Sequence, residues 1–266
     1  MININLKNGD CLEVLKTLQD KSIDLILQDP PYNTTACKWE WDIMTKIDEF
    51  WAEWKRVIKD NGAIIMTASQ PFTSALVMSN PAMFKYCWYW KKERGTGFAL
   101  SGKRPLMIVE DVCVFYAKQC TYNPQRKKLD KPYTHVLPIK KGVFEGAVSM
   151  TKSVIDGQRI YTTRTHDTPH QLLEFSRDGA CISNFHPTQK PVALMEYLIK
   201  TYTNEGDTVF DGFMGSGTTG VGCKNLNRDF IGVELNEEYF KIAERRIIEE
   251  RINIKSSKLK KKKGFF

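Results

Sequence analysis

Two short motifs contain residue types that could act together on one substrate. The first is Asp29-Pro30-Pro31-Tyr32, which follows the apolar run 23–28. Because proline has no backbone donor, the carbonyls near it and the Asp29 carboxylate are available to accept hydrogen bonds from an amino group. Tyr32 offers a flat face on which a nucleobase can stack. The motif favours a pocket for the exocyclic amine of an adenine or cytosine flipped out of a duplex, and the alternative is a plain strand-end turn.

The second motif is a glycine-rich turn in the segment 211–220. Gly215, Gly217 and Gly220 follow a G-x-G-x-x-G spacing, and Glu234 stands at the end of the next predicted strand. Glycines permit unusual backbone angles and the close approach of a ligand. A carboxylate at the second strand end can accept hydrogen bonds from both hydroxyls of a ribose. The context favours a nucleotide-like ligand, either NAD or S-adenosylmethionine, over a tight strand-to-helix turn without a ligand.

Alternating strand and helix signals place both motifs at strand ends in an α/β sheet covered by helices. We expect strands 23–28 and 208–211 to be neighbours at the topological switch point, where ligands bind in such sheets. The dipeptide Asn61-Gly62 should end the second helix. We predict strands over 2–6, 23–28, 63–68, 86–91, 108–117, 208–211 and 230–234, and helices over 11–20, 46–60, 71–79, 190–203, 216–226 and 236–251.

From about Lys118 to Phe185 the periodicity is poor, and basic residues alternate with aromatic residues and histidines. A loop-rich basic insert in an α/β protein is often its specificity element, and the alternative is an ordinary surface excursion. The basic tail could contact phosphates or simply aid solubility. We therefore divide the chain into 1–118, the catalytic half of one domain; 119–181, an inserted target-recognition region; 182–252, the cofactor-binding half; and 253–266, the tail.

The composition indicates an anionic partner and an intracellular location. The 266 residues include 39 Lys and Arg against 31 Asp and Glu, a formal charge of +8, and neutralised phosphates would release counterions. The 7 cysteines are scattered without C-x-x-C spacing, which argues for reduced thiols and against a metal site. The amino terminus lacks a signal core and no apolar run is long enough to span a membrane, so we expect a cytoplasmic protein, bacterial or phage-encoded, without a membrane partner.

On these motifs the chain resembles the beta group of amino-methylating DNA methyltransferases, which methylate adenine N6 or cytosine N4 with S-adenosylmethionine. The resemblance covers most of residues 1–118 and 182–250, with the catalytic motif before the cofactor motif. It implies a Rossmann-like methyltransferase fold with a seven-stranded, mostly parallel sheet and an antiparallel edge hairpin. The segments that carry it are D-P-P-Y at 29–32, F-x-G-x-G at 213–217, H-P-T-Q-K-P at 186–191, G-V-E at 232–234 and N-G-D at 8–10.

The resemblance also implies roles for residues, with direct methyl transfer and neither a metal nor a covalent enzyme intermediate. One departure is Gly212, where the family often has proline, and we expect it to loosen the turn and weaken cofactor binding. The expected catalytic residues are Asp29, Pro30, Pro31 and Tyr32. The expected cofactor contacts are Asp10, Asp29, Thr188, Gln189, Lys190, Asp211, Phe213, Gly215, Ser216, Gly217, Thr218 and Glu234. The expected DNA contacts are Lys38, Arg104, Arg126, Lys127, Lys128, Lys140 and Lys141.

Adenine N6 is favoured because aspartate in the first motif position resembles the adenine enzymes, whereas serine is more usual in the cytosine N4 group. Cytosine C5 methylation is excluded because its thiolate usually stands beside a proline, and no Pro-Cys dipeptide occurs. RNA or protein amide methylation remains an alternative through related N-P-P-Y turns. A dehydrogenase would leave residues 29–32 and the insert unexplained, and a non-catalytic DNA-binding relative would not need both motifs intact.

Two further assignments stay open. Residues 33–42 form either a lid over the flipped base, with Lys38 on phosphate, or a loop that Trp39 and Trp41 pack onto the core. Phe72 contributes either to the base pocket or to the ordinary core. The candidate partners are double-stranded DNA, a second copy of the chain, because one small insert would struggle to read a long site, and a cognate restriction endonuclease.

Overall fold

The computed structural model describes residues 2–32, 46–138, 153–156, 159–176 and 189–248. It divides the chain into two compact units, one made of Met1–Asn123 with Gln171–Phe266 and the other of Pro124–His170. None of the helices within the described ranges is both long and apolar enough to cross a membrane.

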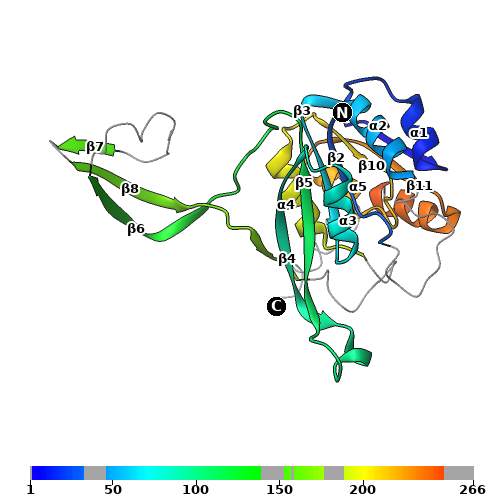
Figure 1. Ribbon diagram of the computed structural model, residues 1–266. Helices are drawn as coiled ribbons and strands as arrows, with labels where there is room; N and C mark the ends of the chain where they lie inside the picture. The colour runs from blue at the N-terminus through cyan, green and yellow to red at the C-terminus, as the bar shows by residue number, and fades with distance from the viewer. Residues whose placement is uncertain (1, 33–45, 139–152, 157–158, 177–188, 249–266) are drawn as a thin grey trace, which may run out of the picture. The chain divides into compact units, whose positions relative to one another are not determined.

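The larger unit is built on an eight-stranded sheet (Figure 1). Neighbouring strands run parallel in the order β1-β11-β10-β2-β3, and β5 then pairs antiparallel with both β3 and β4. This confirms a mostly parallel sheet with an antiparallel hairpin. The strands are β1 (Ile4–Asn8), β2 (Ile23–Gln28), β3 (Ile58–Ala68), β4 (Phe84–Thr96), β5 (Met107–Phe115), β9 (Leu172–Glu174), β10 (Thr208–Asp211) and β11 (Asp229–Glu234).

The expected count of seven strands is too low by one, because β9 pairs parallel with β4 beyond the hairpin. Its three residues are too few to show a period-two pattern in the sequence. The hairpin itself is as expected, although β4 begins earlier and ends later than the range 86–91.

Helices cover both faces of the sheet: α1 (Cys11–Thr17), α2 (Ile47–Val57), α3 (Phe72–Ser79), α4 (Val192–Tyr202), α5 (Thr218–Asn225) and a last helix over 237–248. The predicted end of α2 at Asn61-Gly62 is wrong. Ile58 is already extended and pairs with Ile23 of β2, so the helix ends at Val57, three residues earlier than predicted. Asn61 and Gly62 lie inside β3, and a Cβ at Gly62 would lie 2.8 Å from the Asp24 carbonyl.

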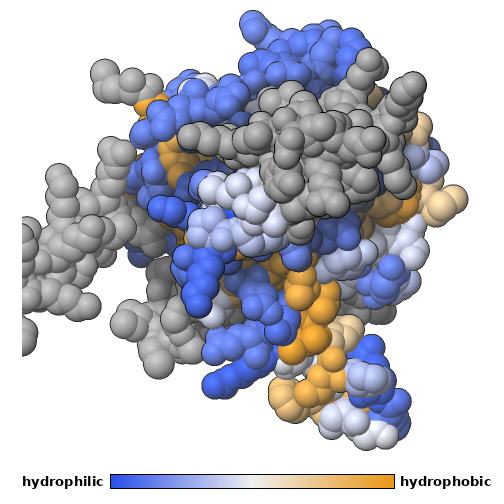
Figure 2. Space-filling view, turned by 90° about the vertical axis from the view of Figure 1, so that its left-hand side faces the viewer, coloured by the Kyte–Doolittle hydropathy of each residue, from blue (hydrophilic) through white to orange (hydrophobic). Residues whose placement is uncertain are grey.

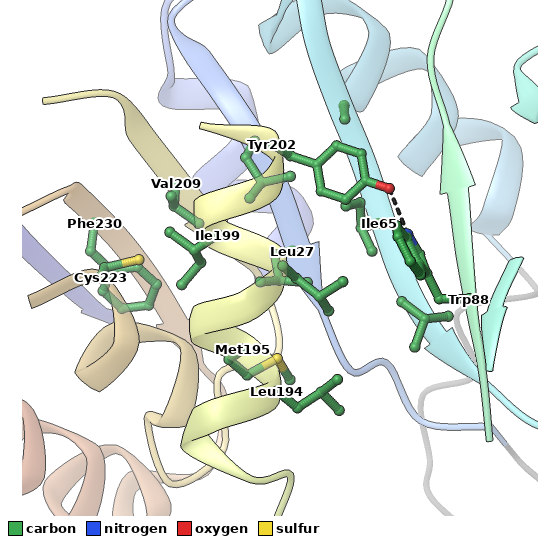
Figure 3. Close-up of a cluster of buried hydrophobic side chains, with 14 of the residues drawn as sticks. Leu27, Ile65, Trp88, Leu194, Met195, Ile199, Tyr202, Val209, Cys223 and Phe230 are labelled. Carbon is green, nitrogen blue, oxygen red and sulfur yellow. Dashed lines mark hydrogen bonds between the residues drawn. The ribbon is translucent and has the colours of Figure 1, made fainter. Parts of the chain in front are cut away.

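Successive residues of the central strands point to opposite faces, as the pleat requires. Leu25 and Leu27 belong to the apolar cluster with α4 and α5, whereas Ile26 belongs to the cluster with α1, α2 and α3. Figure 3 shows the first cluster, in which α4 lies against the sheet and the Trp88 indole donates a hydrogen bond to the Tyr202 hydroxyl at 2.6 Å. Both faces of β2 are therefore buried, which holds the segment that follows it in place.

The strands that carry the two motifs are neighbours, which confirms the prediction. Val209 of β10 is opposite Leu25 of β2, and Phe210 is opposite Ile26. From β2 the chain crosses to β3 on one side, and from β10 it crosses to β11 on the other side. Their carboxyl ends therefore meet at the switch point of the sheet, where ligands bind in open α/β sheets.

The smaller unit, 124–170, is an antiparallel three-stranded sheet in the order β6-β8-β7. Its strands are β6 (Lys127–Pro138), β7 (Ser153–Asp156) and β8 (Arg159–Asp167). The expectation of a loop-rich region is wrong for these residues. A register shift between Lys128 and Tyr133 interrupts the alternation that would have indicated strands, and cross-strand pairs such as Thr134 with Thr163 stabilise the pairing instead.

Candidate active site

The Asp29 carboxylate lies directly after β2, and its two oxygens have different partners. Oδ1 accepts hydrogen bonds from the hydroxyls of Tyr32, at 2.7 Å, and of Thr67 on β3. Oδ2 accepts a hydrogen bond from Lys190 Nζ at 2.7 Å. Since a carboxylate offers about four acceptor sites, Oδ2 can still accept from the amino group of a ligand.

Lys190 is a buried cation that contacts this carboxylate. Its side chain is 5% exposed, and its ammonium lies 2.7 Å from Asp29 Oδ2 and 3.3 Å from Glu110 Oε2. Burial alone would lower the pKa of Lys190, but the carboxylates of Asp29 and Glu110 raise it above its usual value. Lys190 is therefore charged at neutral pH. The sequence suggested only a cofactor contact for this residue, and the structure adds the contact with Asp29.

The Tyr32 ring is held by its neighbours. It stacks on Phe72 with ring centroids 5.3 Å apart, and Lys190 Nζ lies 5.5 Å from its centroid. Burial, followed by the charges of Asp29 and Glu110, raises the pKa of Tyr32 well above its usual value, so the phenol stays protonated. Phe72 on α3 is buried in the core, which confirms the second of its two expected roles, and the contribution to a base pocket stays a prediction.

The glycines of the cofactor motif are required for different reasons. Gly215 has φ +52° and no atom within 4 Å of the place of a Cβ, so it borders open space. Gly217 has φ +83°, and its Cβ would lie 2.9 Å from Ala243 of the last helix. A Cβ at Gly220 would overlap Ile247 of the same helix. Gly215 thus leaves room for a ligand, whereas Gly217 and Gly220 let the last helix pack closely.

Glu234 ends β11 beside Gly215. Its Oε2 accepts a hydrogen bond from the Gly215 amide at 2.9 Å, and its Oε1 accepts one from the Asn236 amide at 2.8 Å. Burial raises the pKa of Glu234, although these backbone donors oppose the shift. A carboxylate offers about four acceptor sites, so Glu234 can still accept from a ribose hydroxyl. Gly9 also borders this place, because its amide donates to the Glu234 carbonyl at 3.0 Å and no atom lies within 4 Å of its would-be Cβ.

Asp10 follows Gly9 and caps α1. Its Oδ1 accepts hydrogen bonds from the amides of Leu12 at 2.8 Å and Glu13 at 3.1 Å. Because β1 pairs with β11 up to Asn8 and Glu234, this cap lies at the same edge of the sheet as the ribose-type carboxylate. The cap accounts for Asp10 structurally, and its second oxygen remains for the predicted cofactor contact.

Asp211 is the most perturbed carboxyl of this edge. Desolvation raises its pKa to about 7, although hydrogen bonds from Thr219 and the Phe213 amide oppose the shift. A ligand cation would stabilise its charged form. Gly212 follows it, and a Cβ there would overlap the buried Cys11 sulfur. Glycine is therefore required at position 212 because the Cys11 sulfur occupies the space that a side chain would need. The expected effect of Gly212 on cofactor binding stays a prediction.

Arg246 is a residue of this site that the sequence interpretation missed. It reaches from the last helix and donates to the Ser216 carbonyl at 2.5 Å and to Ser216 Oγ at 2.8 Å. Ser216 Oγ in turn donates to Gln189 Oε1 at 3.3 Å, which joins the segment before α4 to the glycine turn. Arg246 lies beside Ile247 and three positions after Ala243, on the apolar face of that helix. This position in the sequence could have indicated that the arginine is buried.

Thr67, Glu110 and Lys92 were missed in the same way. Lys92 continues the inward-facing alternation of Trp88 and Trp90 on β4, so its position in the sequence could have indicated a buried charge. Nothing near Thr67 or Glu110 in the sequence indicated Asp29 or Lys190 as partners.

The remaining predicted site residues are cofactor contacts, DNA contacts and residues outside the described ranges. Phe213 contacts Phe50 of α2, and Thr218 begins α5 within 3.5 Å of Arg246. Arg104 is exposed in the turn after the 3₁₀ helix Phe98–Leu100, where Figure 2 shows hydrophilic beside apolar side chains on the projecting hairpin. Three predicted DNA contacts of the smaller unit are exposed: Arg126, Lys127 and Lys128. The predictions for Lys38, Thr188, Lys140, Lys141 and the segment 33–42 lie outside the described residues.

Comparisons with known proteins agree with this geometry. Residues 23–245 match the model of a family described as DNA methylase, of N6 and N4 type. The chain is 31% identical over 257 residues to the type II methyltransferase M.HpaI of Haemophilus parainfluenzae, covering 91% of this chain and 73% of that protein. It is 28% identical over 262 residues to the DNA adenine methyltransferase YhdJ of Escherichia coli K12, covering 90% and 81%. The crystal structure of an M1.HpyAVI–SAM complex superposes with a TM-score of 0.63 at 26% identity, covering 92% of this chain and 99% of that one.

Proposed function

The chain belongs to the DNA methylase family and is a DNA methyltransferase, and we propose that its target is N6 of adenine in DNA. Its cofactor is S-adenosylmethionine, which supplies an electrophilic methyl group when bound. The observation that carries the proposal is the Asp29 carboxylate, which stands at the switch point with an acceptor site left on Oδ2.

In this proposal Asp29 and the carbonyl of Pro30 accept hydrogen bonds from the amino group of the flipped base. These contacts orient a nitrogen whose lone pair is otherwise delocalised into the ring. The nitrogen would then attack the methyl carbon in line as the bond from that carbon to sulfur breaks, and the amino group would release one proton. Thr67 and Lys190 fix the carboxylate, and Tyr32, supported by Phe72, provides the stacking face for the base.

The residues around β10 and β11 fit the cofactor. Gly9 and Gly215 leave open space beside Glu234, whose remaining acceptor sites suit the ribose hydroxyls. Asp211 suits the ammonium of the methionine end, because a cation would offset the burial that raises the pKa of its carboxyl to about 7. Asp10, Gln189, Ser216 and Thr218 complete the proposed contacts.

The choice of adenine rests on the aspartate at the first motif position, and the similarity to the DNA adenine methyltransferase YhdJ is in line with it. Cytosine N4 presents the same kind of amino group and is the alternative. The exposed cations of the smaller unit are proposed to contact the phosphates of duplex DNA. A second copy of the chain and a cognate restriction endonuclease remain proposed partners.

The deciding experiment incubates the purified protein with methyl-labelled S-adenosylmethionine and mixed-sequence duplex DNA, followed by nucleoside mass spectrometry. We expect N6-methyladenine. N4-methylcytosine would keep the mechanism and replace the base. Label in RNA or protein, with none in DNA, would contradict the proposed substrate.

A further inference from the structure

Buried charges continue from Asp29 into the β4–β5 hairpin. Lys190 Nζ lies 2.7 Å from Asp29 Oδ2 and 3.3 Å from Glu110 Oε2, and Lys92 Nζ lies 2.5 Å from Glu110 Oε1. The side chains of Lys190, Lys92 and Glu110 are 5%, 6% and 14% exposed. Buried charges are costly unless they are paired, and here two acids alternate with two bases. We call these four residues the charge chain.

One buried oxygen of the charge chain lacks a hydrogen bond within the described residues. Glu110 Oε2 is buried and accepts no hydrogen bond from the residues that the structure describes, although Lys190 Nζ is 3.3 Å away. A buried acceptor without a hydrogen bond costs free energy, so Glu110 Oε2 is ready to accept a donor that comes closer. Lys190 is a charged donor beside this oxygen, and its hydrogen bonds currently go to Asp29 Oδ2 at 2.7 Å and to the Tyr32 hydroxyl at 3.4 Å.

The proposed reaction brings a second donor to Asp29 Oδ2, and two donors that share one oxygen are each held less strongly. Its Oδ1 already accepts from Tyr32 and Thr67, so the amino group of the target base must approach Oδ2, where Lys190 donates. The Lys190 ammonium is buried and cannot give up its partner without a replacement, because an unpaired buried charge is strongly unfavourable.

We propose that Lys190 moves its hydrogen bond from Asp29 Oδ2 to Glu110 Oε2 when the target amino group reaches Asp29. Glu110 and Lys92 are then positioning residues for the methyl transfer: Glu110 receives the ammonium, and Lys92 holds Glu110 in place. Neither residue touches the substrate. This inference rests on the proposed function and describes one step within it.

The alternative is that Glu110 and Lys92 only anchor the hairpin to the sheet. A pH profile distinguishes the two roles. The charged or titratable groups that face Lys190 are Asp29 and Tyr32 after β2 and Glu110 on β5, with Lys92 of β4 behind Glu110. Because Glu110 helps to raise the pKa of Lys190, removing its charge should lower that pKa, and removing the charge of Lys92 should raise it.

The experiment compares Glu110→Gln and Lys92→Met with the wild type. The matched control is Lys91→Met, because Lys91 is the next residue on β4, is 47% exposed and pairs with Glu174 at 2.7 Å on the other face. For each protein we would measure the dissociation constant of S-adenosylmethionine, the thermal midpoint, and the pH dependence of kcat and KM on PCR-amplified duplex DNA, which carries no methylated bases.

Glu110→Gln should lower kcat by at least about tenfold, which corresponds to ~1.4 kcal/mol of lost transition-state stabilisation, with unchanged cofactor affinity. The alkaline limb of its kcat profile should move to lower pH, because loss of the Lys190 proton leaves Asp29 without its buried partner. Lys92→Met should move the limb to higher pH, and Lys91→Met should match the wild type.

The inference would be overturned if Glu110→Gln kept the kcat and the alkaline limb of the wild type. It would also be overturned if Lys91→Met shifted this limb as much as the two test variants. If Glu110→Gln does not fold, the direction of the shift in Lys92→Met decides the matter. A wild-type protein that binds S-adenosylmethionine but methylates no DNA would overturn the proposed function together with this step. An active wild type with unshifted variants would overturn this step alone.

Discussion

At the residue scale, the two aspartates at the ends of β2 and β10 differ in environment. Asp29 accepts hydrogen bonds from Tyr32, Thr67 and Lys190 and keeps 25% of its side chain exposed. Asp211 is buried, and desolvation raises the pKa of its carboxyl to about 7. The difference suits an acceptor of a neutral amino group at Asp29 and a partner for a cation at Asp211.

Replacing Asp29 should therefore affect the reaction more than cofactor binding. We expect Asp29→Ala to lower kcat by about 10²–10³-fold or more, the effect of removing one preorganised electrostatic contact at a reacting group. The affinity for S-adenosylmethionine, measured by calorimetry, should fall much less than kcat, because Asp211 and Glu234 are untouched. Asp60→Ala on the surface of β3 is the control. Normal turnover by Asp29→Ala would contradict the assigned role.

Cofactor affinity should depend on pH through Asp211. The carboxyl must be ionised to hold an ammonium, and its pKa is raised to about 7, so affinity should be full above that pH and fall as the pH falls through it. A titration calorimetry series from acidic to alkaline pH would show this. Asp211→Asn should bind weakly at every pH, and a pH-independent affinity in the wild type would exclude the contact.

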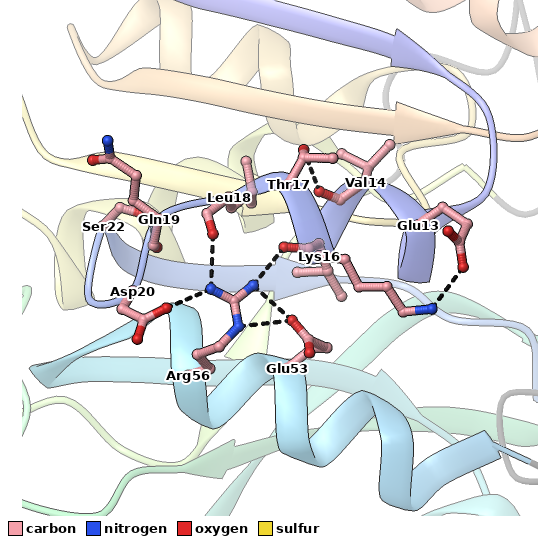
Figure 4. A network of polar contacts seen from close by, with 11 residues as sticks. Glu13, Val14, Lys16, Thr17, Leu18, Gln19, Asp20, Ser22, Glu53 and Arg56 are labelled. Atoms are coloured by element: carbon pink, nitrogen blue, oxygen red, sulfur yellow. Dashed lines mark hydrogen bonds and ion pairs between the residues drawn. The ribbon is translucent and has the colours of Figure 1, made fainter.

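At the element scale, helix ends and helix contacts hold the strand ends in register. Arg56 in the last turn of α2 donates to the Leu15 carbonyl and the Leu18 carbonyl, each at 2.8 Å, which completes the open end of α1 (Figure 4). The same guanidinium pairs with Asp20 and Glu53, each at 2.6 Å. α1 begins at the Asp10 cap, so this network supports the cofactor edge from the far end of the helix.

Arg56→Lys should destabilise the fold, because an ammonium cannot replace the planar fork. We expect a loss of about 1–3 kcal/mol in the free energy of unfolding, since the Leu18 carbonyl loses the arginine donor and the Leu15 carbonyl keeps only the Leu18 amide. Chemical denaturation monitored by circular dichroism measures it. The control is Lys16→Met, which removes only an exposed pair with Glu13 and should leave the free energy of unfolding close to that of the wild type. Equal losses in both variants would show that Arg56 acts as a surface charge.

The glycine turn offers a matched pair of substitutions. Gly217→Ala should destabilise the protein by about 1–3 kcal/mol, because its Cβ would meet Ala243 at 2.9 Å on the last helix. The Cβ of Gly215→Ala would point into open space, so this variant should lose less stability. We expect about 1 kcal/mol, because alanine is strained in the left-handed backbone conformation of this position. This variant should instead weaken cofactor binding. Thermal melts and calorimetry test the pair, and the reverse pattern would assign ligand contact to Gly217.

At the scale of the whole molecule, positive charge is the property that both units share with a DNA-binding protein. The chain has a formal charge of +8, and Arg126, Lys127 and Lys128 are exposed in the smaller unit. Contacts with phosphate release counterions, so such residues contribute affinity that weakens with salt.

Replacing Arg126, Lys127 and Lys128 by glutamine should weaken DNA binding and flatten its salt dependence. Each lost phosphate contact should reduce the slope of log K against log salt by about 1. Fluorescence anisotropy with a mixed-sequence duplex at several salt concentrations measures this. Replacing Lys16, Lys21 and Lys241, which are exposed but paired with acids, is the control. If the slope of log K against log salt is unchanged in the Arg126, Lys127 and Lys128 variant, these residues do not contact DNA phosphates.

Local residue types and periodicity were enough to predict the strand-end motifs and the mostly parallel sheet. The pairing of β2 with β10 was predicted from the rule that ligands bind at the switch point of such sheets. Tertiary structure decided which groups meet. The hydrogen bond from Lys190 to Asp29 joins residues 161 positions apart, and no local pattern specifies such a contact. Packing of the last helix gave Gly217 its role, and pairing with Ile23 ended α2 at Val57. Side chains meet only after the sheet order and the helix packing are established, which is why the charge chain could not be predicted.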